Sequence, residues 1–185
     1  MTVDVPVARM WLVRHAETAW TGRRWCGRAD PPLTAAGLAA ARRLGDELDG
    51  DMPTDAVIVA SPARRARATA DAIAARAGGT VVVEPLLLEV DFGHVEGLTW
   101  GEIVATDAKL ADRILSRAAI DWPGGETATE IAARAVAAAR RLTIIRVGRP
   151  IVVVSHSAFL DALGRTLGVA EDARGLAPCG VRLVA

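Results

Sequence analysis

Two stretches of the chain decide its fold: MWLVRH at residues 10–15 and IVVVSH at residues 151–156. Each is a short apolar run that stops at polar residues, which is typical of a buried strand in a parallel sheet. In open α/β sheets, ligands bind at the carboxyl ends of such strands. The sequence has three histidines, and two of them, His15 and His156, occupy this equivalent position. We therefore expect both to lie at a ligand site.

Strand and helix patterns alternate along the rest of the chain. Amphipathic helical patterns separate strand-like runs at residues 9–13, 56–60, 81–83, 151–154 and 181–184. This alternation predicts a three-layer α/β/α sandwich around a mostly parallel central sheet. At 185 residues, we expect one domain that spans residues 1–185.

Several helix starts carry recognisable signals. We expect Thr34 and Ser157 to cap helices with their hydroxyl oxygens, and Pro62 to open a helix that stops at a Gly-Gly pair. Two further starts have capping-box spacing: Thr99 with Glu102, and Thr127 with Glu130.

Composition narrows the function. Lysine plus arginine equals aspartate plus glutamate at 22 each, so no nucleic-acid or membrane partner is predicted. Cys26 and Cys179 are isolated, without metal-ligand spacing, which favours a reducing compartment and no disulfide. The N-terminus shows no signal peptide, and no apolar run is long enough to span a bilayer. We expect a cytoplasmic protein.

Two segments suit phosphate binding. The Arg14 guanidinium can hold a phosphate oxygen while the neighbouring His15 imidazole approaches phosphorus. Residues 61–70, SPARRARATA, follow a predicted strand and begin a helix, whose N-terminus is an anion site. Either Arg64 or Arg65 can turn inward there.

The order of four motifs resembles the histidine phosphatase superfamily. These are Arg-His after the first strand, Ser-Pro-x-x-Arg-Ala-x-x-Thr-Ala after the second, an acidic loop at residues 85–97, and Ser-His after a late strand. The likeness runs from about residue 10 to the last strand, and it implies a phosphoglycerate mutase-like fold. Residues 27–34 look most like the α-ribazole phosphatase branch, a pattern that broad-specificity members share.

The resemblance assigns roles residue by residue. It implies that His15 is the nucleophile that becomes phosphorylated, and that Glu89 is the proton donor. Asp91 and Glu96 remain alternative acids. The resemblance also gives the rest of the phosphate pocket: Arg14, Arg65 and His156.

Substrate contacts are implied at three further positions: Thr21, Arg24 and Ser157. Thr21 and Ser157 depart from the residues common in the family, as does Cys26, and the spacing before Arg24 is about one residue short. These departures affect the substrate more than the reaction. Trp20, Trp25 and Trp122 are close to the predicted site loops and are candidates to line the pocket.

The chemistry is coherent without the family name. A neutral imidazole can attack a phosphomonoester dianion, cationic side chains stabilise the moving phosphoryl group, and a carboxylic acid protonates the leaving alkoxide. No metal and no cofactor is required. We therefore expect a metal-independent phosphomonoesterase acting on a small phosphorylated metabolite through a phosphohistidine on His15.

Three alternatives stay open. The resemblance implies that a phosphoglycerate mutase-type phosphotransferase carries extra segments that enclose the site, and the short loops here do not supply them. A non-catalytic phosphate-binding module would not need the full set of His15, Glu89 and His156, and a metal-dependent hydrolase lacks its ligand spacing. The oligomeric state is also open, with a homodimer as one option.

Overall fold

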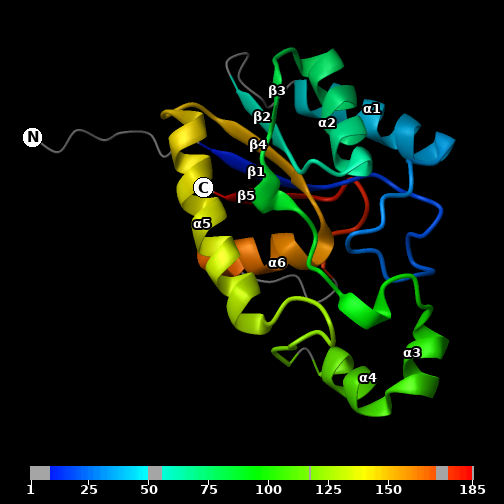
Figure 1. Ribbon diagram of the computed structural model, residues 1–185. Helices are drawn as coiled ribbons and strands as arrows, with labels where there is room; N and C mark the ends of the chain where they lie inside the picture. Colours follow the sequence, from blue (N-terminus) through cyan, green and yellow to red (C-terminus); the bar gives the residue numbers. More distant parts are fainter. Residues whose placement is uncertain (1–8, 50–55, 117, 170–174, 185) are drawn as a thin grey trace, which may run out of the picture.

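The computed structural model describes residues 9–49, 56–116, 118–169 and 175–184. The N-terminal segment in which we expect no signal peptide lies mostly outside these residues. Within the described residues, five strands form one sheet in the order β3-β2-β4-β1-β5 (Figure 1). The strands are β1 (Met10–Arg14), β2 (Val57–Ala60), β3 (Val81–Val83), β4 (Ile151–Ser155) and β5 (Val181–Val184).

The sheet is mostly parallel, as predicted. β1 pairs with β4, β4 with β2, and β2 with β3, all parallel, while β5 runs antiparallel to β1 at one edge. Each expected strand lies within one residue of its predicted ends. The three-layer α/β sandwich is thus confirmed.

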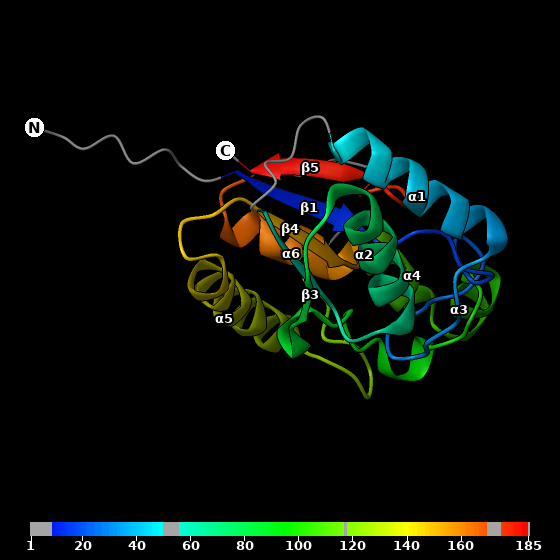
Figure 2. The same ribbon diagram turned by 90° about the horizontal axis from the view of Figure 1, so that it is seen from above.

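Helices cover both faces of the sheet. The helices α1 (Ala35–Asp49) and α2 (Arg64–Ala77) lie on one face, and α5 (Ala128–Arg146) and α6 (Ser157–Thr166) on the other (Figures 1 and 2). The short helices α3 (Trp100–Thr106) and α4 (Ala108–Leu115) lie apart from the sheet, on the side toward which the β1 arrow points in Figure 2.

Alternation along the strands divides the core. In β1, Met10 and Leu12 pack with the apolar face of α5 and α6, whereas Trp11 and Val13 pack with α1 and α2. Successive side chains of a strand point to opposite faces, so a run buried on both sides reads as continuously apolar.

Most of the predicted helix starts are confirmed. Thr34 accepts a hydrogen bond from the Gly37 amide, and both capping boxes are present. The helix expected to open at Pro62 instead begins at Arg64. The prediction that Ser157 caps the last helix is wrong, because His156 is the N-cap residue and a carboxylate from another segment fills the capping position, as described below.

Strand register brings the two histidines to one edge. Arg14 lies opposite Ser155 in the β1–β4 ladder, so the next residue of each strand is a histidine. Ala60 of β2 lies opposite Val154 of β4, which places Ser61 at the same edge.

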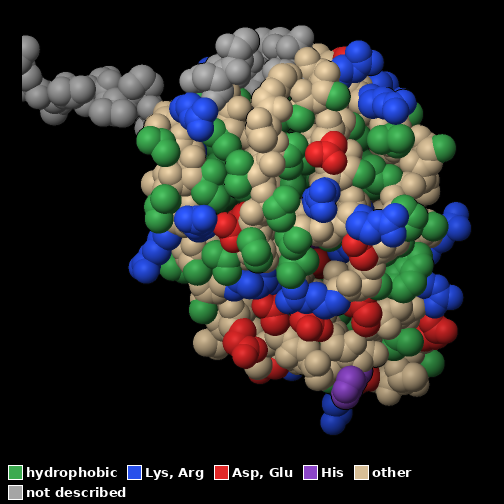
Figure 3. All heavy atoms as spheres, turned by 45° about the horizontal axis from the view of Figure 1, so that its top comes forward, with side chains coloured by type: hydrophobic (Ala, Val, Ile, Leu, Met, Phe, Trp, Pro, Cys, Tyr) green, Lys and Arg blue, Asp and Glu red, His purple; other side chains and the backbone are tan. Residues whose placement is uncertain are grey.

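Charges of both signs share the surface. Figure 3 shows arginine and acidic side chains interspersed on one face of the molecule. None of the helices in the described part of the chain has the length and apolar character needed to cross a bilayer.

Candidate active site

His15 and His156 lie against each other at the carboxyl ends of β1 and β4. Their ring centroids are 5.1 Å apart, in an edge-to-face arrangement. The His15 amide donates to the Ser155 carbonyl at 2.9 Å, which continues the strand pairing into the site. His15 is 7% exposed and His156 is fully buried.

The surroundings of His15 fix its tautomer. Nδ1 lies 2.8 Å from the Ala16 carbonyl oxygen, which can only accept, so Nδ1 carries the hydrogen. The Nε–H of Arg65 donates to Nε2 at 3.3 Å, so Nε2 carries the lone pair. Burial, with the positive charge of Arg65, lowers the pKa of His15 to about 3. The ring is therefore neutral near pH 7, with a nucleophilic Nε2.

Arg65 is the arginine of the pair that turns inward. Its side chain is fully buried, whereas Arg64 is exposed. Its two terminal nitrogens donate to the carbonyls of Ala29 at 2.7 Å and Gly27 at 2.9 Å. Arg65 thus ties His15 to the loop that follows the first strand.

His156 is held from behind by Ser61. Its Nε2 lies 2.8 Å from the Ser61 hydroxyl, and its Nδ1 is buried without a hydrogen-bond partner among the described residues. Burial and the nearby Arg65 lower the pKa of His156 well below its usual value. A buried nitrogen without a partner is costly, which is consistent with a group kept for a ligand.

Arg14 reaches the same edge. Its Nη1 donates to the Leu176 carbonyl at 2.7 Å, and its Nε is buried with no partner in the part of the chain that the structure describes. One part of the guanidinium is therefore fixed by the main chain while another is left unpaired.

Glu89 fills the capping position at the start of α6. Its carboxylate accepts from the Phe159 amide at 2.9 Å, the Ala158 amide at 3.3 Å and its own neighbour Val90 at 2.9 Å. Burial raises the pKa of Glu89, in opposition to these amides and to Arg65, which favour the charged form. This carboxyl is consequently protonated more of the time than an exposed one, which general acid catalysis requires.

The two alternative acids have other roles in the structure. Glu96 accepts hydrogen bonds from the amides of Gly27 and Ala29 and so holds that loop. Asp91 lies 3.6 Å from the guanidinium of Arg28. Neither side chain lines the cavity described next, whereas Glu89 does.

A cavity of about 990 Å³ opens over His15. The predicted substrate-contact residues Thr21, Arg24 and Ser157 line it. Thr21 accepts from the Thr18 amide, and Arg24 donates to the Gly97 carbonyl at 2.7 Å. The cavity also contains Arg14, Glu89 and all three tryptophans expected near the site: Trp20, Trp25 and Trp122. Arg65 and His156 contact His15 but do not line the cavity.

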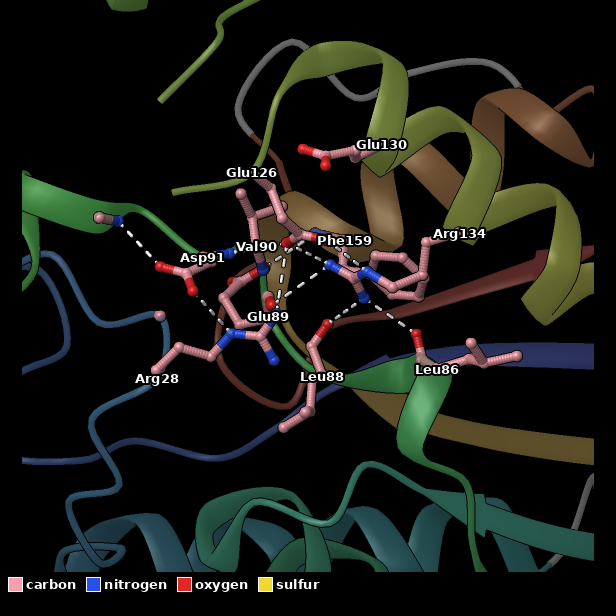
Figure 4. A network of polar contacts seen from close by, with 12 residues as sticks. Arg28, Leu86, Leu88, Glu89, Val90, Asp91, Glu126, Glu130, Arg134 and Phe159 are labelled. Atoms are coloured by element: carbon pink, nitrogen blue, oxygen red, sulfur yellow. Dashed lines mark hydrogen bonds and ion pairs between the residues drawn. The ribbon is translucent and has the colours of Figure 1, made fainter. Parts of the chain in front are cut away.

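Sequence reasoning missed Arg134 of α5, which clamps the Glu89 segment (Figure 4). Its guanidinium makes two 2.7 Å bonds to Glu126 and donates to the carbonyls of Leu86 at 2.9 Å and Leu88 at 2.7 Å. It also lies 4.0 Å from the centre of the Phe159 ring. Arg134 lies three positions after Ile131, next to the apolar stripe of α5. A charged residue at that spacing faces the protein rather than the solvent, and this could have identified it from the sequence.

The loop at residues 123–126, with the sequence Pro-Gly-Gly-Glu, packs directly on the same segment. A side chain on Gly125 would come within 2.3 Å of the Asp91 carbonyl, and one on Gly93 within 2.2 Å of the Pro123 carbonyl. Both positions therefore require glycine. Thr69, within the predicted Ser-Pro motif, accepts from the Ala16 amide and donates to the Arg65 carbonyl, which links the two halves of the site.

Metal ligands do not cluster in this arrangement. Across the residues that the structure describes, no three His, Cys, Asp or Glu side chains are grouped so as to hold a metal ion.

Two curated proteins resemble the chain in sequence. It is 36% identical over 153 residues to the bifunctional protein Rv2228c of Mycobacterium tuberculosis, which covers 80% of this chain and 41% of that protein. The chain thus spans about two fifths of that relative's length. It is 32% identical over 168 residues to a probable phosphoglycerate mutase of Photorhabdus laumondii, which covers 89% of this chain and 77% of that protein.

A solved structure and a family model agree with these likenesses. The native mycobacterial glucosyl-3-phosphoglycerate phosphatase superposes with a TM-score of 0.80 at 29% identity, over 95% of this chain and 89% of that one. The model of the histidine phosphatase superfamily, branch 1, matches residues 10–179, which include both histidines and both arginines at the sheet edge. The chain therefore belongs to the histidine phosphatase superfamily.

Proposed function

We propose that this protein is a phosphomonoesterase that hydrolyses a small phosphorylated metabolite through a phosphohistidine on His15. The observation that carries the proposal is the tautomer of His15. Nδ1–H is held by the Ala16 carbonyl, and the Nε2 lone pair belongs to a ring that lines the same cavity as Glu89.

In the first step, Nε2 of His15 attacks phosphorus and the ester P–O bond breaks. The 3.3 Å hydrogen bond from Arg65 to Nε2 is long, and a phosphate oxygen can take over that donor as the nitrogen is released. The leaving alkoxide takes the proton of Glu89, whose raised pKa keeps it protonated more of the time than an exposed carboxyl.

In the second step, water attacks the phosphohistidine. The Glu89 carboxylate accepts a proton from that water, the P–N bond breaks, and inorganic phosphate and neutral His15 are released. The low pKa of His15 favours its departure as a neutral ring after the transfer.

Two guanidinium groups and the neutral imidazole of His156 stabilise the phosphate charge. Arg14 presents its unpaired Nε, and His156 its unpaired Nδ1. With Arg65, these groups would hold the three oxygens of the transferring group without a metal or cofactor. Each oriented contact of this kind contributes about 3 kcal/mol to the transition state.

The test is phosphate release from a panel of phosphorylated metabolites, including α-ribazole 5′-phosphate, with and without a chelator. We expect turnover that survives the chelator, together with acid-labile phosphate on His15 in a quenched reaction. Binding without any turnover would indicate the phosphate-binding module instead, and loss of turnover with the chelator would indicate a metal-dependent hydrolase.

Phosphoglycerate mutase activity is the second candidate, because one relative is a probable phosphoglycerate mutase. Incubation with 3-phosphoglycerate and a trace of the bisphosphate separates the two reactions. We expect inorganic phosphate to exceed 2-phosphoglycerate, since the cavity is open to water. Rapid interconversion of the monophosphates with little phosphate release would establish the mutase.

A further inference from the structure

The cavity over His15 is much larger than a phosphate group needs. Its volume of about 990 Å³ is at the upper end of small-molecule sites. Away from His15 it is bounded by large apolar side chains, which we call the aromatic wall: Trp25, Phe92, Trp100, Trp122, Ile114 and Ile120.

The rings of the aromatic wall hold one another in place. Trp25 stacks on Trp100 with centroids 6.2 Å apart, and Phe92 meets Trp122 edge-to-face at 4.7 Å. Trp25 also meets Phe92 edge-to-face at 6.1 Å, so the four rings form one connected set. Such offset and edge-to-face pairs are the favoured aromatic geometries, which makes the aromatic wall a preformed surface.

Polar and apolar parts of the cavity come from different elements. Its charged and hydroxyl side chains lie on residues 14–24, on Glu89 and on α6. The side near α3, α4 and the start of α5 adds only aliphatic groups to the aromatic wall, namely those of Ala118, Ala119, Ala128, Ile131 and Ala132. A sugar placed there would find indole N–H groups, such as the buried Trp25 Nε1–H, but no side-chain acceptors, so most of its hydroxyls would lose water without gaining a partner, at a cost for each.

We infer that the aromatic wall binds the alcohol half of the substrate. The enzyme would then act on phosphate monoesters of bulky aromatic alcohols, with two fused rings or more, in preference to sugar phosphates. This inference rests on the proposed function only for the position of the phosphate, at His15 and Arg14. Apolar contact with the rings would supply the selectivity.

Calorimetric titration of two phosphonates tests the aromatic wall without any turnover. We expect 1-naphthylmethylphosphonate to bind about tenfold more tightly than benzylphosphonate, because the second ring buries further apolar area. Glucose 6-phosphate, titrated into a His15→Asn variant to prevent hydrolysis, should bind more weakly than the naphthyl ligand does to that variant. Equal affinities for the two phosphonates, or tighter binding of the sugar phosphate, would overturn the inference.

Neighbouring residues of α4 provide a matched pair of variants. Ile114 lines the cavity, whereas Leu115 is 70% exposed and does not. Ile114→Ser should reduce the tenfold preference for the naphthyl ligand to about twofold or less, and Leu115→Ser should leave it intact. A preference unchanged in Ile114→Ser, or reduced equally in both variants, would argue against binding at the aromatic wall.

A hydrolysis comparison separates this inference from the proposed function. Phenyl phosphate and 1-naphthyl phosphate have leaving groups of similar acidity, so a difference in kcat/KM between them reports binding of the ring. Hydrolysis of both at equal kcat/KM, with equal phosphonate affinities, would refute the aromatic preference and leave the phosphatase intact. A tenfold preference for the naphthyl phosphonate without any hydrolysis would support binding at the aromatic wall and refute the proposed phosphatase activity.

Discussion

The phosphate end of the cavity and the aromatic wall are built in different ways. At the phosphate end, His15, Arg65 and His156 are each 7% exposed or less, and each has at least one polar atom bonded to a main-chain carbonyl or a buried hydroxyl. The aromatic wall comes from loops and from α3 and α4, of seven and eight residues, and Trp100 is 37% exposed. Phosphoryl transfer needs fixed geometry, which adjacent strands supply. Recognition of an apolar group needs apolar contact area rather than exact atomic positions, and loops and short helices can supply that area.

The largest expected effect comes from removing the nucleophile at the phosphate end. His15→Ala should lower kcat by at least about ten thousandfold for every phosphomonoester, because no other group can form the covalent intermediate. Phosphate release measured with phenyl phosphate decides it. The control is His94→Ala, since His94 is exposed and lies outside the cavity lining. Substantial turnover in His15→Ala would mean direct attack by water.

The second change tests the acid at the phosphate end. Glu89→Gln should lower kcat about a hundredfold or more for an alkyl phosphate and less than about tenfold for p-nitrophenyl phosphate, whose leaving group hardly needs a proton. Glutamine still offers an oxygen to the Phe159 amide, so the helix start is preserved.

Glu96→Gln is the matched control for this acid. Glu96 holds the loop at residues 27–29, so any loss of activity there should be the same for both leaving groups. If Glu89→Gln also lowered kcat equally for the alkyl phosphate and for p-nitrophenyl phosphate, Glu89 would not be the acid.

Sequence alone predicted the phosphate end better than the aromatic wall. Each histidine lies one polar residue beyond an apolar run, and parallel strands end at one edge, so local patterns were enough to place them together. Trp25, Trp100 and Trp122 meet only because two loops and the start of α3, far apart in sequence, pack on one another. No local spacing encodes that contact.

The incorrect cap at Ser157 has the same cause. Ser157 has the right residue type for a cap, but the carboxylate of Glu89, about 70 positions earlier, occupies the amides of α6. Arg134 was missed because its partners are carbonyls of a segment some 46 residues away, and an arginine on a helix ordinarily suggests a solvent-facing residue.

Burial of the phosphate end should make stability depend on pH. The folded pKa of His15 is about 3, below its unfolded value near 6.5, so the unfolded chain binds more protons between those values. His15 therefore contributes stability that is present above pH 6.5 and is lost as the pH falls. Between pH 6 and pH 4.5 the loss amounts to about 2 kcal/mol.

Denaturant unfolding of the wild type and His15→Asn measures this contribution. Between pH 6 and pH 4.5, the free energy of unfolding should fall by about 2 kcal/mol less in the variant than in the wild type, because asparagine does not titrate. His156 and Glu89 are present in both proteins, so the difference between the two curves reports chiefly the titration of residue 15. Parallel curves for the two proteins would show that His15 is not desolvated in the folded state.

The smallest expected effect on activity is at Arg134. This residue lies on α5, the helix that contributes to both the phosphate end and the apolar side of the cavity. From α5, Ile131 lines the apolar side of the cavity, while Arg134 holds the carbonyls of Leu86 and Leu88 ahead of Glu89. Arg134→Met should lower kcat about tenfold for an alkyl phosphate, because a mobile Glu89 meets the leaving oxygen less often. The decrease should be smaller for p-nitrophenyl phosphate, which depends less on the acid, and KM should change little.

The leaving-group dependence distinguishes positioning from general destabilisation. A protein that is merely less folded would lose activity equally for both substrates. Arg141→Met is the matched control, since Arg141 lies two turns along α5 and pairs with Glu84 at 3.1 Å, away from the cavity. If Arg134→Met lowered kcat to the same extent with both leaving groups, the clamp would serve the fold alone, and the precise placement of Glu89 would have to come from the amides of α6.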